Sequence, residues 1–172
     1  MSPWNLGSLL PGDAGITQTV NAIRQAVAYA LRQYPIRQRA EAVTANVPER
    51  DERGDVRAIF DWTIAHYKYV RDPVGLEMVK SPEIADAEIE SNGFFQGDCD
   101  DVTAYMAALL KAIGYTVRAV TISIPGKGHA FRHIYLKVYL PKAGKWLSLE
   151  GTARRRPMGF EAPNERFKTY PL

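Results

Sequence analysis

Residues 97–101, GDCDD, place one thiol among three carboxyl groups at the start of a predicted helix. Only the thiolate form of a cysteine attacks a carbonyl carbon, and the unpaired N–H groups at a helix start lower the pKa of a thiol. The neighbouring Asp98, Asp100 and Asp101 oppose thiolate formation unless they point away or pair with cations. Cys99 is therefore a candidate nucleophile that needs a basic partner, and a small, buried, inert thiol is the alternative.

Histidine is the natural partner for such a thiol, and the chain has three, His66, His129 and His133. We expect His66 to pack on the flank of a helix and His129 to be exposed in a glycine-containing loop. His133 opens a predicted strand, which holds its side chain in a fixed direction. His133 is therefore the candidate general base.

A predicted hairpin brings Glu150 to His133. If PKAG is a four-residue loop, Leu140 faces Lys145 and Glu150 lies opposite Tyr135. His133 and Glu150 are then diagonal neighbours on one sheet face, about 7–8 Å apart at the backbone, which a glutamate side chain can bridge. A carboxylate in this position fixes the imidazole tautomer and supports its charged form. The sequence thus predicts a nucleophile, a base and an orienting group.

The acidic cluster also raises the alternative of a metal site, since the thiol, the aspartates and a histidine all offer ligand atoms. One cysteine among adjacent aspartates matches neither the paired spacing of zinc sites nor the spaced oxygens of a calcium loop. Asp98 suits an N-cap, and Asp100 and Asp101 suit the first helical turn, where Arg71 or Arg118 could pair with them. We therefore expect no metal and no cofactor.

The elements that position these residues follow from hydrophobic periodicity. Three- and four-residue steps predict helices over about 17–34, from 55 to near YVRDP at 69–73, over 81–91 and over 99–113. From residue 116 the period changes to two, which predicts strands over 116–124, 133–140 and 145–151. Helices followed by hairpin-linked strands predict an α+β fold, with N-terminal helices packed on a C-terminal antiparallel sheet and the cysteine at a helix start.

The length of 172 residues and a hydrophobic fraction of 46% indicate a single domain. The segment 1–16 is rich in glycine and proline, which predicts an irregular lead-in. We expect a connector over 35–53, a core over about 56–153 and a tail over 154–172.

Charge and composition limit which partners and which compartment can be expected. The net charge is +3, and basic residues are spread along the chain apart from Arg154, Arg155 and Arg156, so nucleic acid is an unlikely partner. The three arginines form either a solvated segment or a contact for an acidic or phosphate-rich partner. A single cysteine excludes an intramolecular disulfide and fits a reducing compartment. Neither a signal peptide nor a membrane span is predicted, which favours the cytoplasm.

Three blocks of sequence resemble a known family. GDCDDVTAYMAALLKAIGYTVRAV, RHIYLKVYL and KWLSLEGTA, together with the upstream HYKYVRDPVG, are similar to the core of the transglutaminase-like superfamily. The resemblance covers roughly residues 56–153. It implies that Cys99 is the nucleophile, His133 the general base and acid, and Glu150 the orienting residue. It also calls for an oxyanion donor beside the backbone N–H of Cys99, for which Gln96 is the first candidate and Tyr69 the second.

Two departures from the family pattern narrow the expected activity. The third triad member is more often aspartate, and animal transglutaminases carry an aromatic residue at the position of Asp100. The resemblance therefore favours the compact bacterial or phage-type branch, described as cysteine peptidases, over protein crosslinking. It implies a protein or peptide substrate. The alternative is a phage or prophage structural or assembly protein with phage structural proteins as partners, located in the virion, that keeps the fold with little or no catalysis.

Overall fold

The computed structural model describes residues 4–7, 9–10, 12–73, 77–153 and 155–172. Five helices are found in these ranges: α1 (Asp13–Ala30), α2 (Tyr34–Thr44), α3 (Glu52–Ala65), α4 (Pro82–Asn92) and α5 (Cys99–Ala112). The strands are β1 (Trp4–Gly7), β2 (Tyr67–Tyr69), β3 (Glu77–Val79), β4 (Phe95–Gly97), β5 (Val117–Ser123), β6 (Phe131–Leu140), β7 (Lys145–Leu149) and β8 (Phe167–Pro171). None of these helices is long and apolar enough to cross a membrane.

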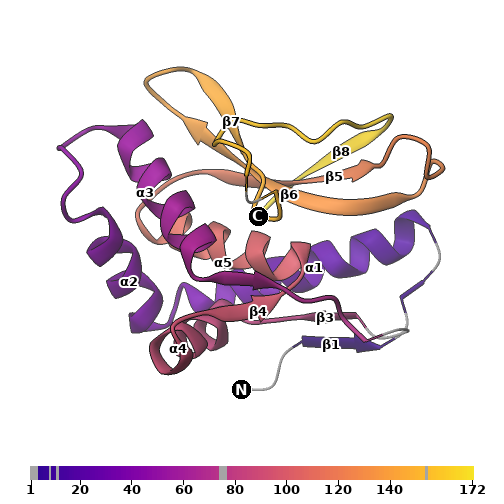
Figure 1. Cartoon of the computed structure of the whole chain (residues 1–172), viewed down its shortest axis with the longest axis horizontal. Helices are drawn as coiled ribbons and strands as arrows, with labels where there is room; N and C mark the ends of the chain where they lie inside the picture. Colours follow the sequence, from indigo (N-terminus) through magenta and orange to yellow (C-terminus); the bar gives the residue numbers. More distant parts are fainter. Residues whose placement is uncertain (1–3, 8, 11, 74–76, 154) are drawn as a thin grey trace.

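The main sheet is antiparallel and has the strand order β7-β6-β5-β8. It forms one layer, and α5 runs beneath it (Figure 1). The helices α2 and α3 lie beside α5, while α4, β3 and β1 lie on the side of α5 away from the sheet (Figure 1). The α+β architecture predicted from the sequence is confirmed.

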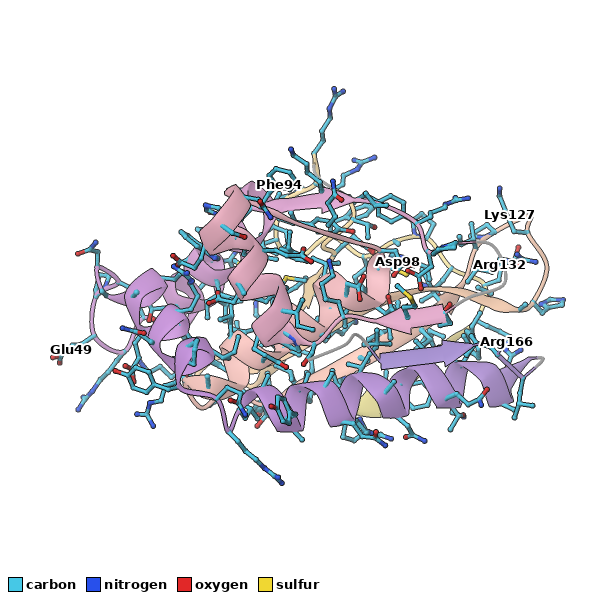
Figure 2. All side chains as sticks on the ribbon, turned by 90° about the horizontal axis from the view of Figure 1, so that it is seen from below. Glu49, Phe94, Asp98, Lys127, Arg132 and Arg166 are labelled. Carbon is cyan, nitrogen blue, oxygen red and sulfur yellow. The ribbon has the colours of Figure 1, made fainter. Side chains whose placement is uncertain are left out.

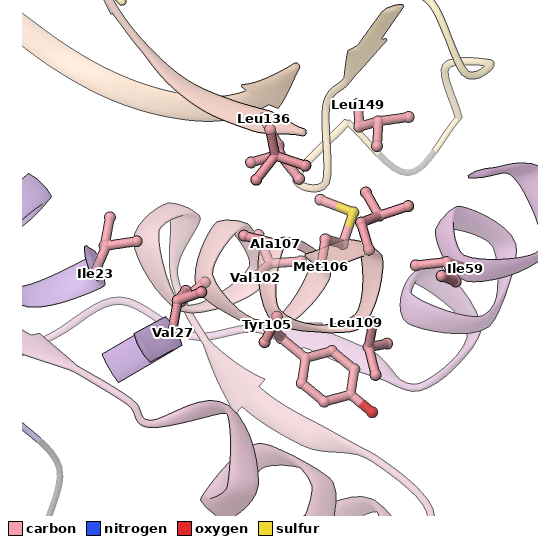
Figure 3. Packing of buried hydrophobic residues seen from close by; sticks show 14 of the residues in the cluster. Ile23, Val27, Ile59, Val102, Tyr105, Met106, Ala107, Leu109, Leu136 and Leu149 are labelled. Atoms are coloured by element: carbon pink, nitrogen blue, oxygen red, sulfur yellow. The ribbon is translucent and has the colours of Figure 1, made fainter. Parts of the chain in front are cut away.

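The central helix α5 is buried on every side from Asp100 to Leu110. Such a helix can carry apolar or small residues on every face, because no face is exposed to water. Ile23 and Val27 of α1 and Ile59 of α3 pack toward it, and Leu136 and Leu149 reach it from the sheet (Figure 3). The helix therefore has a fixed position relative to the sheet, which the site requires.

Two small sheets flank α5. The strands β2 and β4 form a parallel pair, with Tyr69 opposite Gly97. The strands β1 and β3 form an antiparallel pair. Three-residue strands carry almost no periodic signal, so the sequence pattern did not reveal β2, β3 and β4.

The two end segments contain more regular secondary structure than the sequence pattern predicts. The segment 1–16 is not an irregular lead-in throughout, since β1 lies in it and α1 begins at Asp13. The segment 154–172 is not only a tail, because β8 extends the main sheet along β5. Arg24 Nε of α1 donates a hydrogen bond to the Pro171 carbonyl at 2.7 Å, which ties this strand to the helices.

The predicted connector over 35–53 contains the helix α2, with Pro35 in its first turn. The predicted change from helix to connector at residue 35 is wrong, because a proline suits the first helical turn, where its missing N–H has no partner to lose. The helix α1 correspondingly ends at Ala30, earlier than predicted.

Candidate functional site

Carboxylates fix the start of α5. Asp98 is the N-cap and accepts a hydrogen bond from the Asp100 N–H at 3.3 Å. The Asp101 carboxylate accepts from the Asp98 N–H at 3.1 Å and from the Lys80 N–H at 2.6 Å. Together these contacts complete a capping box and attach the helix start to the segment after β3. The predicted role of Asp98 as an N-cap is confirmed.

The turn before Cys99 is held from a second side by Tyr67. Its hydroxyl lies 3.1 Å from the carbonyl oxygens of both Gly97 and Asp98. Burial, followed by the nearby Cys99 and Asp98, raises the pKa of Tyr67, so this hydroxyl remains a donor. Gly97 leaves room for the capping carboxylate, because a Cβ atom there would lie 2.2 Å from Asp101 Oδ2. The backbone at Cys99 is therefore tightly positioned.

Cys99 is partly buried and lies next to α1 and β6. Burial raises the pKa of its thiol well above the ordinary 9.0, and Asp98 and Asp100 raise it further. The backbone N–H of Ile134, which hydrogen-bonds to the sulfur, offsets this only in part. The resting group is consequently a thiol, and attack on a carbonyl requires a base that removes its proton.

His133 and Glu150 form such a base with its orienting group. The Nε2 atom of His133 lies 2.6 Å from Glu150 Oε2, and Glu150 is only 3% exposed. The register is the predicted one, since Leu140 pairs with Lys145. With Nε2–H donating to the carboxylate, Nδ1 is the ring nitrogen that remains for proton transfer.

The Glu150 carboxylate is itself held in place. Its Oε1 atom accepts hydrogen bonds from the Thr152 N–H at 3.0 Å and from the Thr152 hydroxyl at 2.7 Å. Burial alone would raise the pKa of Glu150, but the hydrogen bonds from His133 and Thr152 outweigh it and hold the pKa below 4.5. Glu150 therefore stays ionised at neutral pH and orients the His133 ring.

Two hollows meet at Cys99. The first, which we call the small pocket, has a volume of about 220 Å³ and is lined by Cys99 and His133 together with residues of α1. The second, which we call the open groove, has a volume of about 740 Å³ and lies between the segment after β2 and the loop joining β5 to β6. The structure thus brings the predicted nucleophile and base to one pocket.

The two oxyanion candidates lie in different places. Tyr69 is exposed and lines the open groove with Cys99. Gln96 is also exposed, but it lines a separate hollow with Lys80 and Asp101 and neither hollow at Cys99. The preference for Gln96 over Tyr69 is therefore not supported by the geometry. Gln96 pairs with Lys68 in the β2–β4 ladder, so its position follows from a strand that the sequence pattern did not reveal.

The three aspartates are the acidic groups best placed for a metal ion, with ligand oxygens within 4.8 Å of one another. Most of these oxygens already accept backbone N–H groups at the helix start. In the described part of the chain only Asp100 Oδ2 is a buried carboxylate oxygen of this cluster without a partner. Burial and the adjacent Asp98 and Asp101 raise the pKa of Asp100, which makes it a weaker cation ligand. The cluster mainly organises the helix start.

The remaining sequence candidates lie outside the site. His66 is the C-cap of α3 and stacks on Trp62 with ring centroids 3.8 Å apart, so it is a packing residue as expected. His129 is exposed. Arg118 lies over the Trp146 ring rather than beside an aspartate. Arg154 lies outside the described residues, while Arg155 and Arg156 are exposed.

Sequence reasoning missed two contributors to the site. Tyr67 lies on the buried face of a three-residue strand, and only its place in the HYKYV block gave any signal. The N–H of Ile134 is a backbone group, whose target depends on tertiary packing and not on residue type.

The arrangement defines an α+β protein in which a helix-initial cysteine and a strand histidine share one pocket. The sequence profile described as the transglutaminase-like superfamily matches residues 37–151, which include Cys99, His133 and Glu150. The chain belongs to the transglutaminase-like superfamily.

Two solved structures have a similar fold. A "putative protease" from Parabacteroides distasonis has a TM-score of 0.53 at 16% identity, with coverage of 74% of this chain and 26% of its own. A "putative cysteine protease" from Cytophaga hutchinsonii has a TM-score of 0.51 at 16% identity, with coverage of 80% of this chain and 50% of its own. This chain therefore spans half or less of either structure, and likeness at this identity shows the fold alone. No curated protein matches the sequence.

Proposed function

We propose that the protein is a thiol-dependent hydrolase or acyl transferase that acts on amide bonds of a protein or peptide. The observation that carries this proposal is the His133–Glu150 pair, 2.6 Å apart, at the pocket that also contains the Cys99 thiol. A histidine held by a buried carboxylate can serve as the general base that takes the proton from a nearby helix-initial thiol. Membership of the transglutaminase-like superfamily supports the same reaction class.

The first half of the reaction forms a thioester. His133 Nδ1 takes the proton from Cys99 Sγ as the sulfur attacks the amide carbonyl carbon, and Glu150 stabilises the resulting imidazolium. The backbone N–H of Cys99 and the Tyr69 hydroxyl are candidates to stabilise the oxyanion. When the C–N bond breaks, His133 returns the proton to the departing amine.

The second half releases the acyl group. A water molecule or a second amine attacks the thioester carbonyl while His133 removes its proton. The C–S bond then breaks, and the proton passes to the sulfur, which restores the thiol. Water gives a carboxylic acid, and an amine gives a new amide.

The proposal is tested by the rate at which iodoacetamide alkylates Cys99 at pH 7.5. Because the thiol depends on a base, we expect the rate to fall at least about tenfold in His133→Ala and less in Glu150→Gln. The control is His129→Ala, which changes an exposed histidine of the adjacent loop. A rate that is equally slow in all four proteins would contradict the proposal.

A second candidate is a phage or prophage structural or assembly protein that keeps this fold with little or no catalysis. The observation in its favour is the raised pKa of Cys99, caused by burial and acidic neighbours, which disfavours a reactive thiolate. Under this alternative Cys99→Ser leaves assembly unchanged, as measured by the protein's copurification with particles. Loss of assembly in that variant would count against it.

A further inference from the structure

The two hollows that meet at Cys99 differ in chemistry. Apolar side chains contribute much of the small pocket: Leu9, Ile16, Val20, Phe131 and Ile134. Its volume of about 220 Å³ suits one apolar side chain, since an apolar cavity of about 150 Å³ holds a benzene-sized group. The open groove carries three exposed cations, Arg71, Lys127 and Arg132, of which Arg132 also lines the small pocket.

These three cations are unpaired. Across the described residues, no hydrogen bond, ion pair or ring contact engages the side chain of Arg71, Lys127 or Arg132. Arg166, at the same end of the molecule (Figure 2), is by contrast engaged: it pairs with Asp13 at 3.3 Å and lies over the Phe131 ring. The groove thus places three unpaired cations beside the Cys99 thiol.

The carboxylates that line the groove are already engaged. Asp72 accepts a hydrogen bond from the Met78 N–H, and Glu77 accepts one from the Thr19 hydroxyl at 3.1 Å. The third, Asp98, caps α5. Burial raises the pKa of both Asp72 and Glu77. All three carboxylates are partly buried whereas the three cations are exposed, so the charged side chains that the groove exposes to a ligand are basic.

The backbone explains how Arg132 reaches the groove. In the pairing of β5 with β6, Ile122 faces His133 and Ser123 faces Phe131, so Arg132 is the extra residue of a β-bulge. A bulge interrupts the alternation of side chains and turns one of them away from its regular face. Arg132 is exposed at this bulge, whereas Phe131 is buried and His133 is partly buried in the small pocket.

We propose that the open groove binds an acidic side chain of a polypeptide substrate beside the reacting amide, and that the small pocket takes an apolar side chain from the same segment. This inference rests on the proposed function, because it places the amide at Cys99. Unpaired cations at the mouth of a cleft attract an anionic segment and orient it by charge-assisted hydrogen bonds. The preferred substrate is then an acidic segment that contains an apolar residue.

Binding without turnover provides the test. Cys99→Ala is titrated into fluorescein-labelled Gly-Gly-Leu-Glu-Glu-Gly-Gly and its Gln-Gln counterpart, and into the reversed sequences, with anisotropy as the readout. We expect the acidic peptide to bind about fivefold to tenfold tighter in at least one orientation, because partly exposed charge pairs each contribute modestly. The triple variant Arg71→Ala, Lys127→Ala, Arg132→Ala in this background should remove the preference. The matched control, Arg32→Ala, Arg53→Ala, Arg57→Ala, changes three exposed cations on or near α1 and α3 and should retain it.

A second readout uses the thiol and needs no peptide. The ratio of alkylation rates by anionic iodoacetate and neutral iodoacetamide reports the potential at Cys99. We expect this ratio to fall about threefold in the groove triple variant and to stay unchanged in the control. Equal binding of all four peptides, or an unchanged ratio, would overturn the inference. A retained acidic preference together with alkylation that is independent of His133 would overturn the proposed function alone.

Discussion

The two sides of the candidate site are fixed by different means. On the helix side, several hydrogen bonds hold the backbone around Cys99: Asp98 and Asp101 act locally within the helix start, and Tyr67 acts from a strand 30 residues away. On the sheet side, one strand register and one buried pair place His133 and Glu150. The helix side therefore has several independent supports, whereas the sheet side depends on a single pair.

The largest expected effect comes from crowding the helix side. In Gly97→Ala the new Cβ would meet the side chain of Asp101, with 2.6 Å to its Cβ atom, and would displace the capping carboxylate. We expect a loss of about 2–4 kcal/mol in the free energy of unfolding, measured by urea denaturation. The control is Gln96→Ala, an exposed neighbour in β4, which should change stability by less than about 0.5 kcal/mol. Equal stability of the two variants would show that the helix start is not tightly packed.

A smaller effect should follow from neutralising the sheet side. Glu150→Gln keeps the shape but removes the charge bonded to His133, and we expect a loss of about 1–2 kcal/mol at pH 7. The pKa of Glu150 is below 4.5 in the fold, so its contribution is present above pH 4.5 and is lost as the pH falls through the folded value. Unfolding measured from pH 7 to 3 should therefore show a steeper loss in the wild type than in the variant. Parallel curves would mean that the pair contributes no charge-dependent stability.

Removing one hydroxyl should weaken the helix side by less. Tyr67→Phe leaves the ring buried but removes one of the two donors to each of the Gly97 and Asp98 carbonyls, so we expect a loss of about 1 kcal/mol. Because the same carbonyls precede Cys99, the alkylation rate should change as well. Tyr69→Phe, which alters an exposed residue of the same strand, should leave stability unchanged. If Tyr67→Phe changed neither stability nor the alkylation rate, the capping box alone would account for the position of Cys99.

The smallest expected effect is on the pH dependence of Cys99 alkylation and not on stability. Alkylation of Cys99 should reach half its maximal rate above pH 9.0, because burial, Asp98 and Asp100 raise the thiol pKa. Asp98→Asn keeps a good N-cap residue but removes one negative charge, so the midpoint should move modestly to lower pH. Circular dichroism of the variant checks that the helix is intact. A midpoint at or below 8.5 in the wild type would contradict the assigned environment of the thiol.

The contrast between the two sides also explains what the sequence could predict. The α5 boundaries and the Asp98 cap follow from local signals, because a long amphipathic pattern and an N-cap lie within a few residues. The His133–Glu150 contact followed from counting through one short loop, which works when the hairpin is regular. The place of Gln96 outside the two hollows at Cys99 could not be predicted, because it depends on β4, which is three residues long and paired in parallel with a distant strand. The bulge at Arg132 left no periodic signal, since a single extra residue is set by pairing and not by composition.

The strand β8 also governs how the molecule meets its neighbours. Without it, β5 would present a long row of unpaired backbone groups, rich in valine and isoleucine, that other chains could extend. Because β8 pairs with β5, the edge strand on this side of the sheet is β8. It is five residues long and carries Lys168 and Pro171, which both discourage further strand addition. The strand β8 therefore protects this edge of the main sheet against edge-to-edge aggregation.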